Sequence, residues 1–460
     1  MRILIKPHRF SETVRVPASK SHTIRRLLLA ALGEGVSEIR YPLDSLDARS
    51  CVAVCRGLGA DITELRAEDP LCPNPADEEG KRLVAWTVRG VGGAGLRANG
   101  GPLDVGNSGT TLFLVLAAAA LGREDVVFTG DAQIARRGAG PLLEALRGLG
   151  ITVSSGPGGC VPITVRGPWR GGRVSLPCPT SQYLSALLLA APLAPAGTVT
   201  EIDVPLLNEK PYIDLTLSYL KAQGIPWEGA ADYSYFRIPG GASYKPVNGP
   251  VIGDFSSAAF PGCAAAIGGF AIGGSAILGE STALGESTTL LGLDPHDCQG
   301  DKAVFDMLAH MGCDVAWDRL DGEWRLRVSC GGGLRGGRFD LNDTPDLLPV
   351  AAVLGAYAEG ETALVNVAHA RIKETDRIAV MAGELGKLGA AITERPDGLV
   401  IRGGGLRGGA VDGHGDHRVV MALAVAALGA SGPVEIAGAE SAAVTYPGFP
   451  ELMAAHIIEE

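Results

Sequence analysis

The sequence predicts an α/β protein of two pseudo-symmetric domains, because a single pattern of residues occurs six times along its 460 residues. In each copy, a short polar segment runs into a long apolar stretch, and a Gly-led, β-branched segment and a second helix follow. The polar segments begin near residues 19, 106, 180, 254, 342 and 415. The longer interval falls at the same place in both halves of this series, so the chain consists of three units followed by three more.

The first copy begins at Ala18–Arg25 and continues into the apolar run Leu27–Leu32. Ser19 or Ser21 can cap the helix that starts here, and the N–H groups of its first turn then face outward. Lys20 and Arg25 add positive charge at the same end of the helix. This helix start is therefore predicted to hold an anion.

The other five polar segments also precede apolar stretches that predict helices. The segments are GNSGTT at 106–111, TSQY at 180–183, DFSS at 254–257, NDTPD at 342–346 and GDHR at 415–418. The apolar stretches lie at 112–121, 184–194, 258–267, 347–356 and 419–428. Second, amphipathic helices are predicted within 48–62, 140–153, 214–227, 302–315 and 376–392, where apolar residues recur at three and four before a Gly. The sixth, at 449–453, is cut short.

The boundary between the two domains is predicted from a short Pro/Gly stretch, 245–250, just before the fourth unit. The alternating N-terminal segment belongs with the C-terminal half if the two halves are alike. We therefore expect one domain at 18–250 and a second made of 1–17 and 251–460. The chain then crosses between them near 17–20 and 245–253.

Composition excludes several classes of protein. A net charge of −11 argues against a nucleic-acid surface, and nine cysteines without paired spacing indicate a reducing compartment and no structural zinc. The N-terminus lacks the apolar segment of a signal peptide, so we expect a cytoplasmic protein. Residues 255–279 carry no charge, which raises the question of a membrane span. Pro261 and the glycine pairs at 268–269 and 273–274 favour a buried helix, a turn and a strand instead.

Charged residues that could perform chemistry gather at the helix starts and in two loops. Lys373, Glu374 and Arg377 lie close together, either as part of a site or as a solvated helix start with surface ion pairs. His414 and His417 could suggest a metal, but no third ligand lies nearby, so we expect none. The loop 130–138 carries two arginines and is either a mobile basic lid or a plain exposed loop. GNSGTT lacks the ending of a P-loop, which disfavours ATP hydrolysis.

Ten ordered motifs give the chain a resemblance to a known family. They are the six polar segments above with their flanks, together with GDAQIARR at 130–137, QGD at 299–301, RIKETDR at 371–377 and TYPGFPEL at 445–452. This set, collinear from residue 18 to about 450, resembles the enolpyruvyl transferases, and among them the 5-enolpyruvylshikimate-3-phosphate synthase family. The resemblance implies two domains of three βαβαββ units each, an inside-out α/β barrel, in agreement with the count of repeats.

The resemblance also implies an activity. Members of this family transfer the enolpyruvyl group of phosphoenolpyruvate to the 5-hydroxyl of shikimate 3-phosphate and release phosphate, a step of aromatic amino acid biosynthesis. Two polyanionic ligands need several cations, and the proton transfers need positioned carboxylates. The family is typically monomeric, and the reaction calls for no metal or organic cofactor.

The site residues that the resemblance implies fall into three groups. Lys20, Asp346 and Glu374 are catalytic, with Asp346 accepting the 5-hydroxyl proton and Glu374 exchanging a proton with the methylene carbon. The residues for shikimate 3-phosphate are Lys20, Ser21, Arg25, Thr180, Ser181, Gln182, Tyr212, Asp346 and Lys373. The residues for phosphoenolpyruvate are Lys20, Gly109, Arg137, Gln182, Arg377 and Arg418.

The chain departs from the family at a few of these positions. Glu209 stands where many relatives carry a phosphate-binding Ser, and an ionised Glu beside a phosphate repels it. Glu209 therefore points away, or Lys210 compensates, or the acceptor is not the usual phosphate ester. Phe113 removes a cation near phosphoenolpyruvate, and His369 replaces an Asn of some relatives.

Two alternative functions follow from these departures. The first is enolpyruvyl transfer to another acceptor, UDP-N-acetylglucosamine or a non-phosphorylated cyclitol. The loop 130–140 lacks the Cys that the enzyme for UDP-N-acetylglucosamine usually carries. The second is a non-catalytic binding protein of the same fold, against which stands the joint presence of Lys20, Asp346, Glu374 and three arginines.

Overall fold

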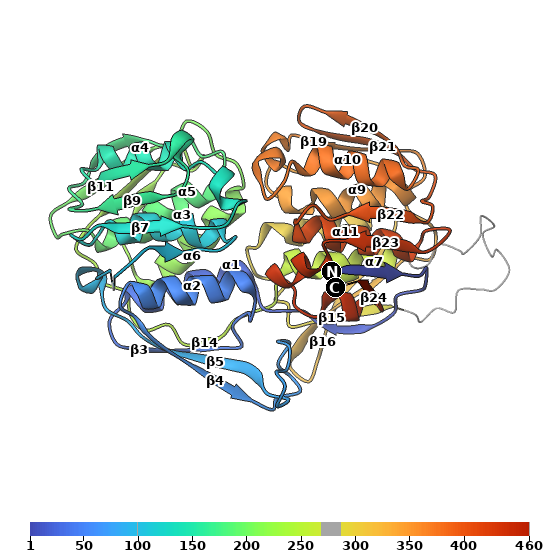
Figure 1. Cartoon of the computed structure of the whole chain (residues 1–460), viewed down its shortest axis with the longest axis horizontal. Coiled ribbons are helices and arrows are strands. Elements are labelled where there is room, and N and C mark those ends of the chain that lie inside the picture. Colours follow the sequence, from blue (N-terminus) through green and yellow to red (C-terminus); the bar gives the residue numbers. More distant parts are fainter. Residues whose placement is uncertain (99, 268–286, 460) are drawn as a thin grey trace. The chain divides into compact units, whose positions relative to one another are not determined.

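A computed structural model describes residues 1–98, 100–267 and 287–459. The chain divides into two compact units (Figure 1). One, which we call the continuous unit, is Lys20–Val251, and the other, the two-segment unit, combines Met1–Ser19 with Ile252–Glu460. The chain thus passes from one unit to the other after Ser19 and again after Val251.

In the part of the chain that the structure describes, six four-stranded sheets confirm the six-fold pattern. In the continuous unit they are β14-β3-β5-β4, β6-β7-β9-β8 and β10-β11-β13-β12, and in the two-segment unit β2-β15-β17-β16, β18-β19-β21-β20 and β22-β23-β1-β24. Every sheet has one parallel pair followed by two antiparallel pairs. The order β10–α5–β11–α6–β12–β13 is the predicted βαβαββ unit.

The strands of the continuous unit are β3 Val36–Arg40, β4 Asp61–Ala67, β5 Arg82–Arg89, β6 Leu103–Asp104, β7 Val126–Thr129, β8 Thr152–Ser155, β9 Ile163–Arg166, β10 Gly172–Ser175, β11 Val199–Asp203, β12 Glu228–Gly229, β13 Tyr235–Pro239 and β14 Gly249–Pro250. Those of the two-segment unit are β1 Arg2–Ile5, β2 Thr13–Arg15, β15 Thr288–Leu291, β16 Asp314–Leu320, β17 Glu323–Ser329, β18 Arg338–Asp340, β19 Glu361–Val365, β20 Ala391–Arg395, β21 Gly398–Arg402, β22 Gly409–Asp412, β23 Val434–Ala437 and β24 His456–Glu459. The N-terminal strand β1 pairs with β23 and β24 of the last copy.

The first helix of each copy forms where the apolar stretch predicts it. These helices are α1 Lys20–Leu32, α3 Gly109–Ala119, α5 Ser181–Ala190, α7 Phe255–Ile267, α9 Leu348–Tyr357 and α11 His417–Leu428. Every residue of α3, α9 and α11 is buried, as expected for helices that are apolar on all sides. Their polar N-terminal ends carry the predicted site residues.

The second helices are α2 Leu46–Gly57, α4 Gly140–Gly148, α6 Lys210–Gln223, α8 Ala303–His310, α10 Arg377–Lys387 and α12 Phe449–Leu452. They bury one face only, as their amphipathic pattern predicts. The last is a single turn, as expected for the sixth, truncated copy.

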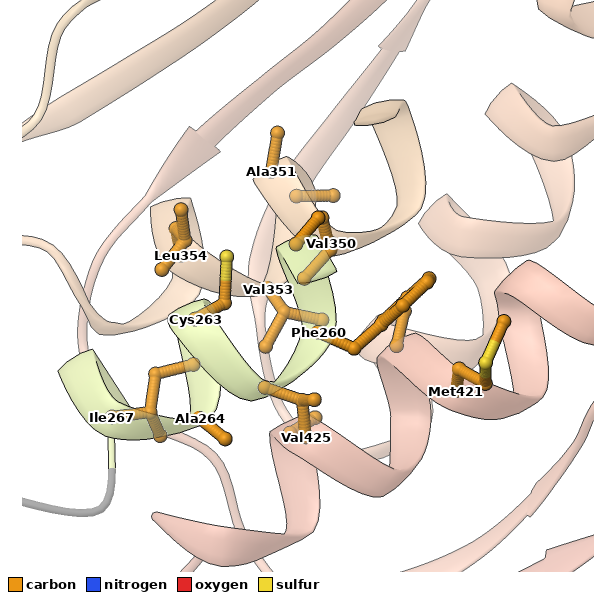
Figure 2. Close-up of a cluster of buried hydrophobic side chains, with 14 of the residues drawn as sticks. Phe260, Cys263, Ala264, Ile267, Val350, Ala351, Val353, Leu354, Met421 and Val425 are labelled. Carbon is orange, nitrogen blue, oxygen red and sulfur yellow. The ribbon is translucent and has the colours of Figure 1, made fainter. Parts of the chain in front are cut away.

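The core of the two-segment unit is built by its three apolar helices. Figure 2 shows side chains of α7, α9 and α11 interdigitating, among them Phe260, Val353 and Val425. In the surrounding sheets, β1, β15, β19 and β23 bury every second residue, so one face of each of these strands packs on the helices. Helices therefore lie inside and sheets outside, which is the inside-out α/β arrangement that the sequence predicts.

The uncharged segment 255–279 begins as the buried helix α7. The turn and strand predicted after it, at 268–279, lie outside the described residues. Within the described ranges, the structure holds no helix long and apolar enough to cross a membrane.

Candidate active site

A buried arginine joins three carboxylates in the two-segment unit. Arg377 has an exposed fraction of 0% and lies at the start of α10. Its Nη1 donates to Asp346 Oδ1 at 2.7 Å, its Nη2 to Glu374 Oε2 at 2.6 Å, and its Nε to Asp416 Oδ2 at 2.8 Å. The fork of the guanidinium group thus holds three acids around one cation, a geometry that lysine cannot provide.

The starts of three helices bring these side chains together. Asp416 caps α11 by accepting a hydrogen bond from the Arg418 N–H, and Asp376 caps α10 in the same way. Asp346 lies in the turn Pro345–Leu347, which leads directly into α9. Because polar cap residues precede each apolar helix in the sequence, the packing of the helices gathers their caps.

Further cations balance the charge of this cluster. Arg418 Nη2 lies 2.9 Å from Asp346 Oδ2. Burial acts to raise the pKa of Asp346, but the charges of Arg418, Lys373 and Arg377 outweigh it and hold that pKa well below its usual range. Asp346 is therefore ionised, and it lies beside cations that can bind an anionic ligand.

The carboxyl group of Asp301, in the same unit, favours the protonated form, unlike that of Asp346. Burial, followed by the charge of Asp346, raises its pKa to about 7. The Ser256 hydroxyl donates to Asp301 Oδ2, while Oδ1 has no hydrogen-bond partner among the described residues. Asp301 thus retains its proton over a pH range in which Asp346 is charged.

Asp301 should make the stability of the protein depend on pH. The folded chain binds this proton more tightly than the unfolded chain, since the pKa is raised from 3.8 to about 7. The free energy of unfolding should therefore fall as pH rises through this window, by at most about 1.4 kcal/mol per pH unit. Asp301→Asn should remove this part of the slope in denaturant titrations at pH 5, 6 and 7.

The matched control for this prediction is Asp306→Asn, at an exposed position of α8. This variant should keep the slope of the wild-type protein. Parallel stability curves for wild type and Asp301→Asn over the same pH range would contradict the raised pKa.

A lysine and a carboxylate form a second cluster in the continuous unit. Lys20 Nζ lies 3.1 Å from Asp47 Oδ2, and the two side chains are 14% and 6% exposed. Lys20 is the first residue of α1, and Asp47 lies in the first turn of α2, which Ser45 caps. Of the two serines predicted as possible caps of α1, Ser21 lies inside the helix and Ser19 directly precedes it.

Arg25 is buried and is held by α5 and α6. Its Nε donates to Thr216 Oγ1 at 3.0 Å, and its Nη2 donates to Ser185 Oγ at 3.4 Å and to the Tyr212 carbonyl at 3.3 Å. Its Nη1 reaches the Ser21 carbonyl at 3.3 Å. Three residues predicted to bind shikimate 3-phosphate, Ser21, Arg25 and Tyr212, therefore lie together.

The starts of α3 and α5 are linked to each other. Gln182 Nε2 donates to Thr110 Oγ1 at 3.1 Å. A Cβ atom at Gly109 would collide with the Arg137 guanidinium, so glycine permits this close approach. Phe113 stands where the family resemblance implies a cation. Its ring packs edge-on against Tyr183, with 5.1 Å between ring centroids, and so fills this position. The loop that carries Arg137 is anchored by the buried Ile134.

Glu209 does not point away from the predicted phosphate-binding residues. Its Oε2 accepts hydrogen bonds from Thr180 Oγ1 at 3.1 Å, from the Ser181 N–H at 3.0 Å and from Ser181 Oγ at 2.7 Å. The first alternative derived from the sequence, a side chain turned away, is therefore wrong. The side chain is buried at the N-terminal end of α5, where the family resemblance places the phosphate.

The structure thus brings predicted residues together within each unit. In the two-segment unit, the predicted residues around Arg377 are Asp346, Lys373, Glu374 and Arg418. In the continuous unit they form the groups Ser21–Arg25–Tyr212, Thr180–Ser181–Glu209 and Gly109–Arg137, with Gln182 next to Thr110 and Lys20 next to Asp47. His369 is buried in the turn Ala368–Ile372.

Sequence reasoning missed two of the carboxylates that pair with the predicted site cations. Asp47 pairs with Lys20, and Asp416 pairs with Arg377, although neither was assigned a role. Asp416 and Asp301 lie inside recognised motifs, GDHR and QGD, so their motifs were a usable signal. Asp47 follows a capping Ser, a pattern common to many helices, and no local signal marks it.

Comparisons with known proteins agree with this geometry. The family described as EPSP synthase (3-phosphoshikimate 1-carboxyvinyltransferase) matches residues 4–453. The 3-phosphoshikimate 1-carboxyvinyltransferase of Acetivibrio thermocellus is 45% identical over 450 residues, covering 98% of this chain and 96% of that protein. The protein of the same description from Ruminiclostridium cellulolyticum is 43% identical over 452 residues, covering 98% and 97%.

Solved structures are similar as well. An EPSP synthase structure from Acinetobacter baumannii superposes with a TM-score of 0.76 at 28% identity, covering 98% of this chain and 97% of that chain. The enolpyruvyl transferase NikO from Streptomyces tendae superposes with a TM-score of 0.72 at 18% identity, over 98% and 97% of the two chains, and supports the fold alone. In both comparisons, the similarity therefore extends over nearly the whole length of this chain and of the solved structure.

Proposed function

Since this chain belongs to the EPSP synthase family, we propose that it transfers the enolpyruvyl group of phosphoenolpyruvate to the 5-hydroxyl of shikimate 3-phosphate and releases phosphate. The observation that carries this proposal is the 45% identity to a 3-phosphoshikimate 1-carboxyvinyltransferase over 98% of the chain. The reaction belongs to aromatic amino acid biosynthesis. None of the comparisons favours UDP-N-acetylglucosamine, a non-phosphorylated cyclitol or a purely binding role.

The two-segment unit supplies the proton transfers in this proposal. Glu374 gives a proton to the methylene carbon of phosphoenolpyruvate, C2 becomes cationic, and the 5-hydroxyl attacks C2 as Asp346 takes its proton. Glu374 then takes a proton back from the resulting methyl group as phosphate leaves, which restores the methylene, and the proton held by Asp346 passes to the released phosphate. The hydrogen bonds from Arg377 to both acids support these roles, because they fix the two carboxylates relative to each other.

In this proposal, substrate binding also changes the pKa of Asp346. Asp346 is ionised because Arg418, Lys373 and Arg377 surround it. When the carboxylate and phosphate of phosphoenolpyruvate engage Arg377 and Arg418, part of that positive charge is neutralised and the pKa of Asp346 rises. An acid that is a weak base in the free protein thereby becomes a better base in the loaded one.

The remaining predicted residues bind the two substrates in this proposal. Lys20 neutralises charge on both substrates. The shikimate 3-phosphate set is Ser21, Arg25, Thr180, Ser181, Gln182, Tyr212, Asp346 and Lys373, and the phosphoenolpyruvate set is Gly109, Arg137, Gln182, Arg377 and Arg418. The donors at the start of α5 and the buried guanidinium of Arg25 support anion binding.

We further propose that the protein acts in the cytoplasm as a monomer and without a metal or organic cofactor. All nine cysteines are free thiols, which suits a reducing compartment. The net charge of −11 disfavours nucleic acid as a partner. Sedimentation velocity at increasing protein concentration tests the monomer, and a mass that doubles with concentration would contradict it.

The proposed function predicts phosphate release that depends on the phosphorylated acceptor. Purified protein should release inorganic phosphate from phosphoenolpyruvate when shikimate 3-phosphate is added, with a steady-state rate that saturates in both substrates. Plain shikimate and UDP-N-acetylglucosamine at the same concentration are the controls and should give little release. If phosphate is released with plain shikimate or UDP-N-acetylglucosamine but not with shikimate 3-phosphate, the acceptor is different from the proposed one.

A further inference from the structure

The N-terminal end of α5 already contains an anion. Glu209 has an exposed fraction of 2%, and one of its carboxylate oxygens accepts hydrogen bonds from a backbone N–H and two hydroxyls, those of Ser181 and Thr180. Several donors that converge at the start of a helix form an anion-binding site. Here the bound anion comes from the chain itself.

The backbone at Glu209 is also unusual. Its φ and ψ angles of 62° and 43° lie in the left-handed region, which is uncommon for a residue other than glycine. Glu209 directly precedes α6, whose Tyr212 N–H donates to the Glu209 carbonyl at 3.1 Å. A strained backbone and a buried charge are both unfavourable, and their coincidence at one residue indicates a functional position.

We propose that Glu209 is an internal competitor for the phosphate of the acceptor, and that it sets how strongly the protein prefers shikimate 3-phosphate over plain shikimate. This inference rests on the proposed function, in which Thr180 and Ser181 hold that phosphate. The phosphate has to take these donors from the carboxylate or lie beside it, and the two like charges repel each other. Plain shikimate carries no group that competes with Glu209.

Two variants separate the charge of Glu209 from its volume. Glu209→Gln removes the charge and keeps the shape of the side chain, whereas Glu209→Ser also opens space for a ligand. Titration calorimetry should show that each variant binds shikimate 3-phosphate about tenfold or more tightly than wild type, the size expected when a charged competitor for hydrogen bonds is removed. The affinity for plain shikimate should stay unchanged.

Inorganic phosphate is a probe that does not depend on catalysis. Its affinity should rise in Glu209→Gln, and adding Ser181→Ala to that variant should reduce the rise. This second substitution removes the Ser181 hydroxyl, which donates at 2.7 Å, and keeps the backbone N–H as a donor. The matched control is Glu228→Gln, an exposed acid that pairs with Arg237 at 3.2 Å and should leave all three affinities unchanged.

The outcomes distinguish this inference from the proposed function. Unchanged or weaker binding of shikimate 3-phosphate and inorganic phosphate in Glu209→Gln would overturn the inference and show that Glu209 only links α5 to α6, even if turnover continues. Tighter phosphate binding without any turnover of phosphoenolpyruvate and shikimate 3-phosphate would support the competitor and reject the proposed reaction. Thermal melting confirms that each variant is folded, and Glu209→Gln alone decides if Glu209→Ser does not fold.

Discussion

Lys20→Met and Glu374→Ala should each reduce turnover by about 10²-fold to 10⁴-fold, the usual cost of removing an electrostatic or proton-transferring group. Lys20 is mostly buried and pairs with Asp47, and Glu374 is held by Arg377 at 2.6 Å. The partner that remains in each variant has the opposite charge, so it cannot replace the side chain that was removed. The measurement is the steady-state rate of phosphate release. Arg137 and Arg418 remain in both variants, so phosphoenolpyruvate should still raise the melting temperature in part.

Two exposed ion-pair residues provide the controls for these variants. Lys81→Met removes a lysine that pairs with Glu79 in the continuous unit, and Glu361→Ala removes an acid that pairs with Arg402 in the two-segment unit. Both should retain wild-type turnover. Wild-type turnover in Lys20→Met or Glu374→Ala would refute the assignment of that residue.

Arg377→Met should destabilise the two-segment unit by about 3–5 kcal/mol, since removing one partner of a buried ion pair leaves the other uncompensated. Three carboxylates depend on this guanidinium, and it is fully buried. Burial acts to lower the pKa of Arg377, but Asp416, Glu374 and Asp346 outweigh it and raise that pKa well above its usual value. Urea unfolding at pH 7 measures the loss, and turnover should be lost with it.

Arg402→Met is the matched control, because Arg402 is 76% exposed and its partner Glu361 lies 3.5 Å away. Its cost should be at most about 1 kcal/mol. Arg377→Lys should lie between the two, since lysine keeps the charge without the three-way fork. Equal stability of Arg377→Met and Arg402→Met would contradict the role of Arg377 as the centre of the cluster.

The six-fold pattern is predictable from the sequence for a physical reason. Apolar residues on all sides of a helix require burial on all sides, so the sequence alone is enough to place α3, α9 and α11 in the interior. Capping residues have an equally local signature, and Thr180, Ser108 and Asp416 cap their helices in the structure.

The pairings within the site could not be predicted from sequence. Asp47 reaches Lys20 across two helices, and Glu209 reaches Ser181 through an uncommon backbone conformation, so both depend on tertiary packing rather than on neighbouring residues. The charge state of Asp301 likewise depends on its burial near Asp346. The motifs thus identified the cations and the acids Asp346 and Glu374, while the pairing of Asp47 with Lys20 and the contacts of Glu209 required the fold.

The central claim, enolpyruvyl transfer, is tested most directly by following the carbon atoms of the donor. Phosphoenolpyruvate labelled with ¹³C at C2 is incubated with shikimate 3-phosphate and the protein, and the products are analysed by NMR and mass spectrometry. We predict that the label becomes bonded to the 5-oxygen of the acceptor as phosphate is released in equal amount. Label found as free pyruvate, or phosphoenolpyruvate left unconsumed, would contradict the account.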